Sequence, residues 1–299
     1  MNDRDWLTEK FEENRPHLRA VAYRMLGSMG EVDDAVQEAW LRLNRTDARR
    51  IENLGGWLTT VIARVCLDML RSRKSRREES LEDHNERMPD FVLSREDRID
   101  PEQETLIADS VGLALLVVLE TLSPQERLAF VLHDMFAVPF DEIAAIVGCS
   151  SVAARQLASR ARRRVRGGAP AHDVDLIQQR RVVNAFLAAV RAGDFEGLMA
   201  VLDPDVVRRS DHIPGELNEI RGARTVAEQA IMFSRLAASA QPVLVNGAAG
   251  IISWLPDGQP FSVMGFTIQR QVDGNRIVAI DVFRDPARLG RLDLTMLKA

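Results

Sequence analysis

The chain contains very little cysteine. Its 299 residues include only Cys66 and Cys149, too few for a disulfide framework and without the spacing of a zinc site. Each is expected to be a small buried or turn residue rather than a reactive thiol. We therefore expect no metal site and no cofactor.

Long hydrophobic runs are also missing. The longest, from Val111 to Leu119, is far shorter than the roughly 20 residues that cross a bilayer as a helix. The N-terminal stretch MNDRDWLTEKFEENR is polar and mixed in charge, unlike a signal peptide. These absences predict a cytoplasmic protein with no membrane partner.

The sequence has no internal repeat and no glycine-rich phosphate loop. Hydrophobic residues make up 46% of the chain, which is ample for packed cores and argues against global disorder. A length of 299 residues exceeds that of a typical single domain. We expect two or three domains.

Charge is segregated along the chain, although the net charge is only −5. Residues 64–77 carry six bases and one acid, residues 78–109 carry twelve acids and three bases, and residues 151–166 carry six arginines and no acid. Such local asymmetry indicates interaction with nucleic acid more directly than the net charge does.

Periodicity and turn signals divide the chain into four segments. Residues 1–77 are expected to form an all-helical domain and residues 78–104 an acidic linker in which Phe91, Val92 and Leu93 form an apolar island, a candidate anchor point. Residues 105–167 are helical again. Residues 173–299 change to two helices, a further helix and several strand-like runs, which predicts an α+β domain with a curved antiparallel sheet.

The second helical segment contains a helix-turn-helix pattern. Ser123 to Glu126 forms a capping box with proline at the first helical position. The run PFDEIAAIVGCSSVAARQLASRARRRVRGG then places Gly148 at a left-handed turn between two helices. In the second helix, Val152, Ala154 and Leu157 are expected to face the core.

This second helix offers residues that can read DNA. Arg155, Gln156 and Ser159 are spaced to face a groove together, with Arg160 beside them. Arginine can bind guanine and glutamine can bind adenine through two hydrogen bonds each, whereas the later arginines suit phosphates. The alternative is a solvated arginine-rich face. The two basic segments lie far enough apart to make two separate DNA contacts.

Three motifs together resemble bacterial RNA polymerase sigma factors of the extracytoplasmic-function class. They are EVDDAVQEAWLRL (31–43), GGWLTTVIARVCLDMLRS (55–72) and LSPQERLAFVLHDMFAVPFDEIAAIVGCSSVAARQLASRARRRV (122–165). Residues 173–299 resemble a SnoaL-like, NTF2-type cone domain, which is fused to sigma factors in one subset of the class. The implied fold is two all-α sigma domains followed by an α+β cone.

The resemblance implies functional residues in each region. Residues 1–77 would be sigma domain 2 and residues 105–167 sigma domain 4, contacting the β′ clamp and β flap of core RNA polymerase and promoter DNA. Core binding would fall on Asp33, Asp34, Gln37, Glu38, Trp40 and Leu41. Contacts to the −10 element would fall on Asn53, Arg64, Arg71, Arg73, Lys74, Arg76 and Arg77. Contacts to the −35 element would fall on Ser151, Arg155, Gln156, Ser159, Arg160 and Arg163.

Some of these residues have an ordinary structural alternative. The acids of the 31–43 helix would also suit a helix N-terminus alone. Trp57 is expected more in the core than stacked on a base. The acidic linker either mimics nucleic acid inside a basic channel or is a solvated spacer. It also lacks the Trp-Leu-Pro-Glu-Pro motif common in fused relatives and has RMPDFVLS instead.

The C-terminal domain gives a weak signal for catalysis. Asp211 and His212 are a tempting acid–base pair, but adjacent strand residues point to opposite faces and no further partner is evident. Phe261, Trp254 and Met264 are candidates for a pocket wall or for core packing. We expect no enzyme activity, and a small-molecule ligand stays an open option.

These observations predict an alternative sigma factor, a monomer when free, that is regulated in cis by its C-terminal domain. A ligand-responsive helix-turn-helix regulator would explain the pocket domain but not the 31–43 helix or the basic helix after Trp57. A cyclase or isomerase fused to a DNA-binding module would need a stronger acid–base pair. The promoter sequence, the inducing signal and any anti-sigma partner cannot be deduced from the sequence.

Overall fold

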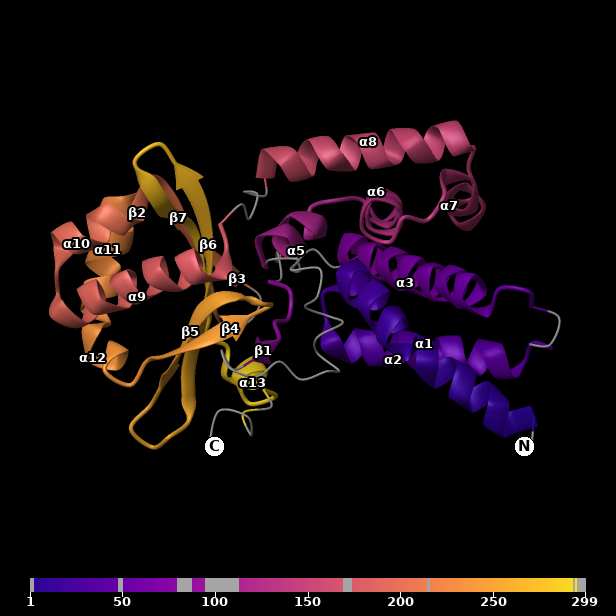
Figure 1. Cartoon of the computed structure of the whole chain (residues 1–299), viewed down its shortest axis with the longest axis horizontal. Coiled ribbons are helices and arrows are strands. Elements are labelled where there is room, and N and C mark those ends of the chain that lie inside the picture. Colours follow the sequence, from indigo (N-terminus) through magenta and orange to yellow (C-terminus); the bar gives the residue numbers. More distant parts are fainter. Residues whose placement is uncertain are drawn as a thin grey trace. The chain divides into compact units, whose positions relative to one another are not determined.

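A computed structural model describes residues 3–47, 51–79, 88–94, 113–168, 174–213, 216–292 and 294. The chain divides into two compact units, which Figure 1 draws. The first unit consists of residues 1–84 and 116–168, and the second of residues 85–115 and 169–299. Each unit has its own buried core.

The described part of the first unit is helical throughout (Figure 1). Its elements are α1 (Asp3–Leu26), α2 (Met29–Asn44), α3 (Leu54–Glu79), α5 (Leu113–Glu120, whose first residues belong to the second unit), α6 (Pro124–Phe130), the π-helix η2 (Val131–Met135), α7 (Phe140–Val147) and α8 (Ser151–Gly168). Helices α1, α2 and α3 pack against one another.

Helix α3 begins three residues earlier than the position of Trp57 suggests. Asn53 caps it, because its Oδ1 accepts a hydrogen bond from the backbone N–H of Gly56 at 3.0 Å. The apolar side of α3 is buried, except that Met69 is half-buried. Trp57 is also half-buried. Cys66 lies in this core, and burial raises the pKa of its thiol.

The predicted helix-turn-helix is present as α7, a turn and α8. Ser123 and Glu126 form the expected capping box before α6, and Gly148 adopts φ 77° and ends α7. Cys149, in the turn, is half-buried. The prediction was wrong for Val152, which is 60% exposed.

The two helical segments pack together inside the first unit. Helix α3 contacts α6 and α7, and α1 contacts η2. At this junction His17 Nε2 lies 3.1 Å from Thr59 Oγ1 and its ring packs edge-on against Phe136. Burial lowers the pKa of His17 from its ordinary value, and the nearby charge of Arg24 lowers it further.

We predict that this histidine makes the first unit sensitive to acid. The unfolded chain binds the proton at a higher pH than the folded chain, so stability falls as the pH drops through about 6.5, the ordinary histidine pKa. His17→Gln should flatten the dependence of the thermal midpoint on pH between about pH 7 and 5. Parallel curves for the variant and the parent would contradict the prediction.

The second unit is an α+β cone around one seven-stranded sheet. Its elements are β1 (Leu93–Ser94), α9 (Leu176–Ala192), α10 (Phe195–Val201), β2 (Leu202–Ile213), β3 (Glu216–Arg221), α11 (Ala223–Met232), α12 (Ser234–Ala237), β4 (Gln241–Val245), β5 (Ala248–Trp254), β6 (Pro260–Gln271), β7 (Gly274–Phe283) and α13 (Pro286–Leu289). The strand order is β1-β4-β5-β6-β7-β2-β3.

The sheet is mixed rather than purely antiparallel. Strands β2 and β7 pair in parallel, whereas every other pair is antiparallel. The expected α+β class is confirmed, and the parallel pair corrects the expectation of an antiparallel sheet. The sheet differs from the expectation because sequence periodicity did not predict β2 and β3. These strands extend the sheet beyond β7, and β2 pairs with β7 in parallel.

The two faces of this sheet bury two separate clusters. Side chains such as Ile251 and Val282 face the helices α9 to α11, whereas their neighbours Ile252 and Phe283 face the opposite side. Figure 1 shows the helices on one side of the sheet and α13 on the other.

The apolar island of the acidic linker belongs to the second unit. Leu93 and Ser94 pair with β4 as an edge strand, and the Phe91 ring lies 4.2 Å from that of Phe283 between centroids. Asn246, in the left-handed turn between β4 and β5, donates its N–H to the Val92 carbonyl and accepts the Val92 N–H at its side-chain Oδ1. The predicted anchor point is therefore part of the sheet.

Candidate polymerase and nucleic-acid interfaces

Helix α2 presents a mixed acidic and apolar surface. Asp33, Asp34 and Gln37 are exposed, and Leu41 is 40% exposed although it is a large apolar residue. The buried side of the helix consists of Val32, Ala35, Val36, Ala39 and Leu43. The buried side packs within the first unit, so the exposed side, with its acids and Leu41, stays available to a partner.

The other two predicted core-binding residues are half-buried. Trp40 packs on Phe11 of α1 with ring centroids 4.9 Å apart, and Glu38 pairs with Arg42 at 2.8 Å. Next to Trp40 a groove opens between α1 and α2, lined by Thr8, Phe11, Glu12, Arg15, Arg19, Asp33, Val36, Gln37 and Trp40. The rim of the groove carries the ion pairs Glu12–Arg15 and Asp33–Arg19, and its apolar floor is suited to an apolar side chain of a partner.

The residues predicted to contact the −10 element differ in their exposure to solvent. Asn53, Arg64, Arg71 and Lys74 are exposed, whereas Arg73 is half-buried. The side chains of Arg76 and Arg77 lie outside the described residues. The Arg64 guanidinium reaches the Ala145 carbonyl of α7 at 3.5 Å, so this side of α3 faces the helix-turn-helix.

Arg73 belongs to a cluster of four charges that spacing alone did not reveal. Its guanidinium pairs with Glu31 of α2 and lies 3.6 Å from Glu120 of α5. Glu120 also accepts a 2.8 Å hydrogen bond from Arg127 of α6, whose side chain is 2% exposed. This charge cluster of Glu31, Arg73, Glu120 and Arg127 joins the two helical segments.

The exposed surface of α8 forms one stripe. Val152, Arg155, Gln156, Ser159 and Arg163 are all exposed and follow helical spacing, so they lie on one face of the helix. The Arg155 guanidinium rests 5.6 Å from the centre of the Phe140 ring, which holds it at this face. We call these five residues the recognition face.

Val152 is the residue that the sequence analysis missed at this site. It was assigned to the core because it is apolar, yet it occupies the first position of the recognition face. An exposed apolar side chain there can contact a thymine methyl group in the major groove. The signal was present in its spacing of three and four residues from Arg155 and Gln156.

Three further arginines of α8 lie close to acids distant in sequence. Arg162 pairs with Asp134 at 2.5 Å, Arg164 pairs with Glu126 at 3.0 Å, and Arg160 lies 3.9 Å from Glu126. Ser151 is half-buried and its hydroxyl has no hydrogen-bond partner among the described residues. Arg155 and Arg163 form no ion pair within the described part of the chain.

Comparison with known proteins identifies these helices. Sigma-70 region 2 matches residues 11–76, and Sigma-70 region 4 matches residues 112–165. The chain is 39% identical over 257 residues to the ECF RNA polymerase sigma factor SigJ of Mycobacterium tuberculosis, covering 81% of this chain and 79% of SigJ. The chain belongs to the ECF family of RNA polymerase sigma factors.

Two further comparisons extend over the full length of this sigma factor. The probable ECF sigma factor SigI of M. tuberculosis is 33% identical over 299 residues, covering 98% of each chain. The crystal structure of M. tuberculosis SigJ superposes with a TM-score of 0.74 at 33% identity, covering 96% of this chain and 99% of that one. The resemblance to fused ECF sigma factors with a SnoaL-like, NTF2-type domain is thus confirmed.

ECF sigma factors are alternative sigma factors that bind core RNA polymerase and promoter DNA and initiate transcription. The helix-turn-helix of this sigma factor lies in region 4, and its basic helix α3 lies in region 2. The family assignment decides against a regulator that acts without becoming a polymerase subunit.

The carboxylate of Asp211, a catalytic candidate in the sequence, is held by three hydrogen bonds. Asp211 Oδ1 accepts the backbone N–H groups of Arg284 and Asp285, and Oδ2 accepts a 2.8 Å hydrogen bond from Arg288. The side chain of His212 lies outside the described residues. Within the described ranges, no cluster of three or more metal-ligating side chains occurs and no helix is long and apolar enough to cross a membrane.

Proposed function

We propose that this sigma factor reads a two-part promoter through α3 and the recognition face of α8. In this proposal residues 1–77 act as sigma domain 2, residues 78–104 as linker, residues 105–167 as sigma domain 4 and residues 173–299 as a regulatory SnoaL-like domain. The observation that carries it is the recognition face, where Arg155 and Gln156 stand exposed and no acid in the described part of the chain pairs with Arg155.

Core polymerase is proposed to dock on α2 through Asp33, Asp34, Gln37, Glu38, Trp40 and Leu41, and sigma domain 4 on the β flap. The support is the exposure of Asp33, Asp34 and Gln37 on α2, with the 40% exposed Leu41 on the same helix. Contacts of this kind concentrate binding energy in a few apolar residues at the centre of an interface.

We predict that Leu41→Asp lowers affinity for core polymerase about tenfold or more, because it places a charge in the apolar centre of the interface. Leu41 is partly exposed, so the fold should persist. Asn44→Asp, at an exposed position on the same helix, is the matched control. Affinity is measured by fluorescence anisotropy of labelled sigma factor titrated with core enzyme, and equal affinities of the two variants would contradict the α2 docking site.

The proposed −10 contacts are Asn53, Arg64, Arg71, Arg73, Lys74, Arg76 and Arg77. Arg73 is held in the charge cluster, and Arg64 lies against Ala145. We propose that this compact arrangement belongs to the free sigma factor and that core binding separates the helical segments. Separation would free Arg73 for phosphates of the opened strand.

Regulation in cis is proposed to act through the docked linker. Residues 88–94 are anchored in the second unit by β1, by Phe91 and by Arg288, which donates to the Pro89 carbonyl at 2.7 Å and pairs with Asp90. This docking shortens the chain that connects the two sigma domains. A C-terminal domain that holds the linker can therefore limit how far these domains separate.

We predict that Asn246→Gly loosens the docked linker. Glycine keeps the positive φ of this turn but removes the Oδ1 that accepts the Val92 N–H. The Val92 amide should then exchange with solvent about fivefold faster, as expected for one lost hydrogen bond. Val272→Ala, at a fully exposed position, is the control. Unchanged exchange at Val92 would show that this hydrogen bond does not hold the linker.

No catalytic chemistry is proposed for the chain. Asp211, the acid that suggested an acid–base pair, is engaged by Arg288 and two backbone N–H groups. A cytoplasmic, monomeric free state stays part of the proposal.

Promoter melting tests the proposed function. The sigma factor is combined with core polymerase and a promoter library, and permanganate footprinting locates unpaired thymines. A melted segment next to the −10 element supports the proposal, and duplex DNA throughout would overturn it.

Removing residues 170–299 tests the regulation, because unchanged core affinity and transcription would show that the C-terminal domain exerts no control.

A further inference from the structure

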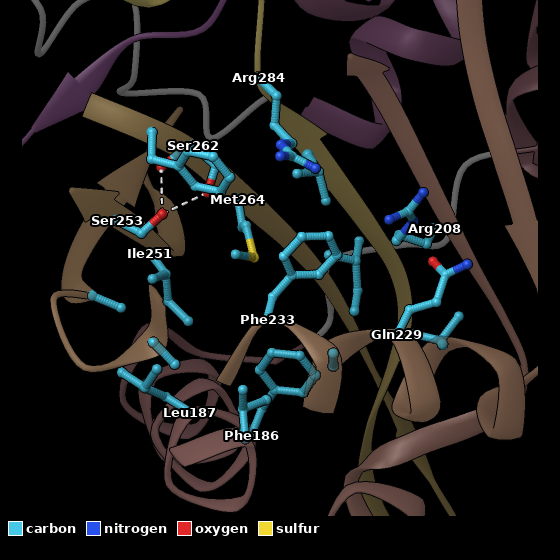
Figure 2. A pocket seen from close by; sticks show the side chains of 18 residues that line it. Phe186, Leu187, Arg208, Gln229, Phe233, Ile251, Ser253, Ser262, Met264 and Arg284 are labelled. Atoms are coloured by element: carbon cyan, nitrogen blue, oxygen red, sulfur yellow. Dashed lines mark hydrogen bonds between the residues drawn. The ribbon is translucent and has the colours of Figure 1, made fainter. Parts of the chain in front are cut away.

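The second unit encloses a pocket between the inner face of its sheet and helices α9 and α11. Figure 2 shows its lining, with Phe186 and Leu187 on one side and Ile251 on another. Its volume, measured as the space open to the centre of a water molecule, is about 80 Å³. On the same measure one water needs ~10–15 Å³, so the pocket has room for a small ligand. Phe261 and Met264, two candidates from the sequence, line it, whereas Trp254 packs on the opposite face of the sheet.

Two arginines stand at one side of this otherwise apolar pocket (Figure 2). Arg208 comes from β2, and Arg284 directly follows β7. The Arg284 guanidinium lies over the rings of Phe261 and Phe233, at 4.4 and 5.1 Å from their centres. Aromatic faces position a cation without neutralising it.

Neither arginine has a carboxylate partner among the described residues. Arg208 donates only to the Asn218 side chain at 3.3 Å, and the Nε atoms of Arg208 and Arg284 are buried without hydrogen-bond partners. Burial lowers the pKa of both arginines, and the charge of Arg284 lowers the pKa of Arg208 further. The charge of Asp211 raises the pKa of Arg284 in return, but the Asp211 carboxylate is hydrogen-bonded to Arg288 and to two backbone N–H groups.

Two like charges that are partly removed from water, with no carboxylate in ion-pair contact among the described residues, favour the binding of an anion. Arg209, on the same strand as Arg208, shows the contrast, because it pairs with the buried Asp281 at 3.1 Å.

The rest of the lining determines what kind of anion fits. Apart from the arginines, the polar side chains are Gln229, Ser253 and Ser262, and the two serines hydrogen-bond each other at 2.6 Å. The planar fork of an arginine matches both a carboxylate and a phosphate. A phosphate ester carries nearly two negative charges and would lose more hydration than a carboxylate in this largely apolar lining.

We propose that this pocket binds a small apolar carboxylate, with the carboxylate held by Arg208 and Arg284 and the hydrocarbon part among Phe186, Ile251 and Met264. Gln229 donates a further hydrogen bond from α11. Phe233, 40% exposed at the end of α11, also lines the pocket. The SnoaL-like domain is thereby a receptor for an acidic metabolite, which goes beyond its proposed control of the linker.

Isothermal titration of the full chain with octanoate tests the proposal, with 1-octanol and octylamine as ligands of matched length. Octanoate is expected to bind, and both Arg284→Gln and Arg208→Gln are expected to weaken it by about tenfold or more. Arg224→Gln, at an exposed position of α11, should bind as the parent does. Ala230→Trp, which fills the pocket, should abolish binding.

Three results would overturn the proposal. They are no heat with octanoate, equal affinity for octanol, and octanoate binding that persists in Ala230→Trp. Thermal unfolding of each variant shows whether it is folded. Loss of binding in an arginine variant supports the proposal only when the variant melts at or above the melting midpoint of the parent. Such a midpoint is expected, because the substitution removes an unpaired charge that is partly withdrawn from water. Polymerase is absent from this experiment, so its outcome is independent of the proposed promoter function.

Discussion

Replacing Arg127 by methionine is expected to lower the unfolding free energy of the first unit by about 3–5 kcal/mol. The Arg127 side chain is 2% exposed, donates to Glu120 at 2.8 Å and reaches the Arg24 carbonyl at 3.1 Å. Methionine fills similar space but leaves Glu120 with only the longer contact to Arg73 at 3.6 Å. A partly buried carboxylate that loses its main partner is the source of the destabilisation.

Hydrogen exchange of the buried amides in α3 and α6 measures this loss without interference from the second unit. The control is Arg162→Met, which breaks a less buried pair with Asp134 and should cost about 1 kcal/mol or less. The double variant Arg127→Met with Glu120→Gln should lose less than the sum of the single losses, by about 1 kcal/mol or more. Strict additivity would show that Arg127 and Glu120 do not act as a pair.

The second large effect is expected on promoter binding. Arg155→Ala should weaken binding of the holoenzyme to its promoter by about 1–3 kcal/mol, roughly tenfold to a hundredfold, and relax the base preference at one −35 position. The physical reason is the loss of a charged group that can make two hydrogen bonds to a guanine edge. Arg155 is exposed and rests over Phe140, so the fold does not depend on it.

Arg163→Ala is the matched comparison on the same face. A phosphate contact should weaken binding uniformly across sequences and reduce the slope of log affinity against log salt by about one. Arg224→Ala, exposed in the second unit, is the neutral control. Binding of a randomised −35 library, sequenced after selection at two salt concentrations, separates these effects. An unchanged base preference in Arg155→Ala would remove Arg155 from base readout.

Local signals in the sequence predicted the helices and turns of the helix-turn-helix. The capping box at Ser123 and the left-handed Gly148 depend on residues within a few positions of one another. The four strands β4 to β7 were predicted for the same reason, because their alternation and turns are local.

Contacts between residues far apart in sequence could not be predicted. The partners of Arg73, Glu31 and Glu120, lie 42 and 47 positions away, and Glu126 of α6 satisfies Arg164 of α8. Strand β2 carries several charged residues and a proline, yet it forms because β7 and β3 lie on either side of it. Tertiary pairing outweighs local propensity at such positions.

The acidic linker combines a local feature that the sequence predicted with a long-range contact that it could not predict. Its apolar island was evident in the sequence, but its partner, the turn at Asn246, lies more than 150 residues away. The positive φ of Asn246 was consistent with the Asn-Gly pair in the sequence. Its second role, accepting the Val92 N–H, depends on the folded sheet.

Sequencing the 5′ ends of transcripts made by the reconstituted holoenzyme tests the central claim most directly. The chain is combined with purified core RNA polymerase and genomic DNA, and the starts are compared with those of core enzyme alone. The account predicts a set of starts that share two upstream elements and are lost together in Leu41→Asp. Starts indistinguishable from those of core enzyme alone would contradict it.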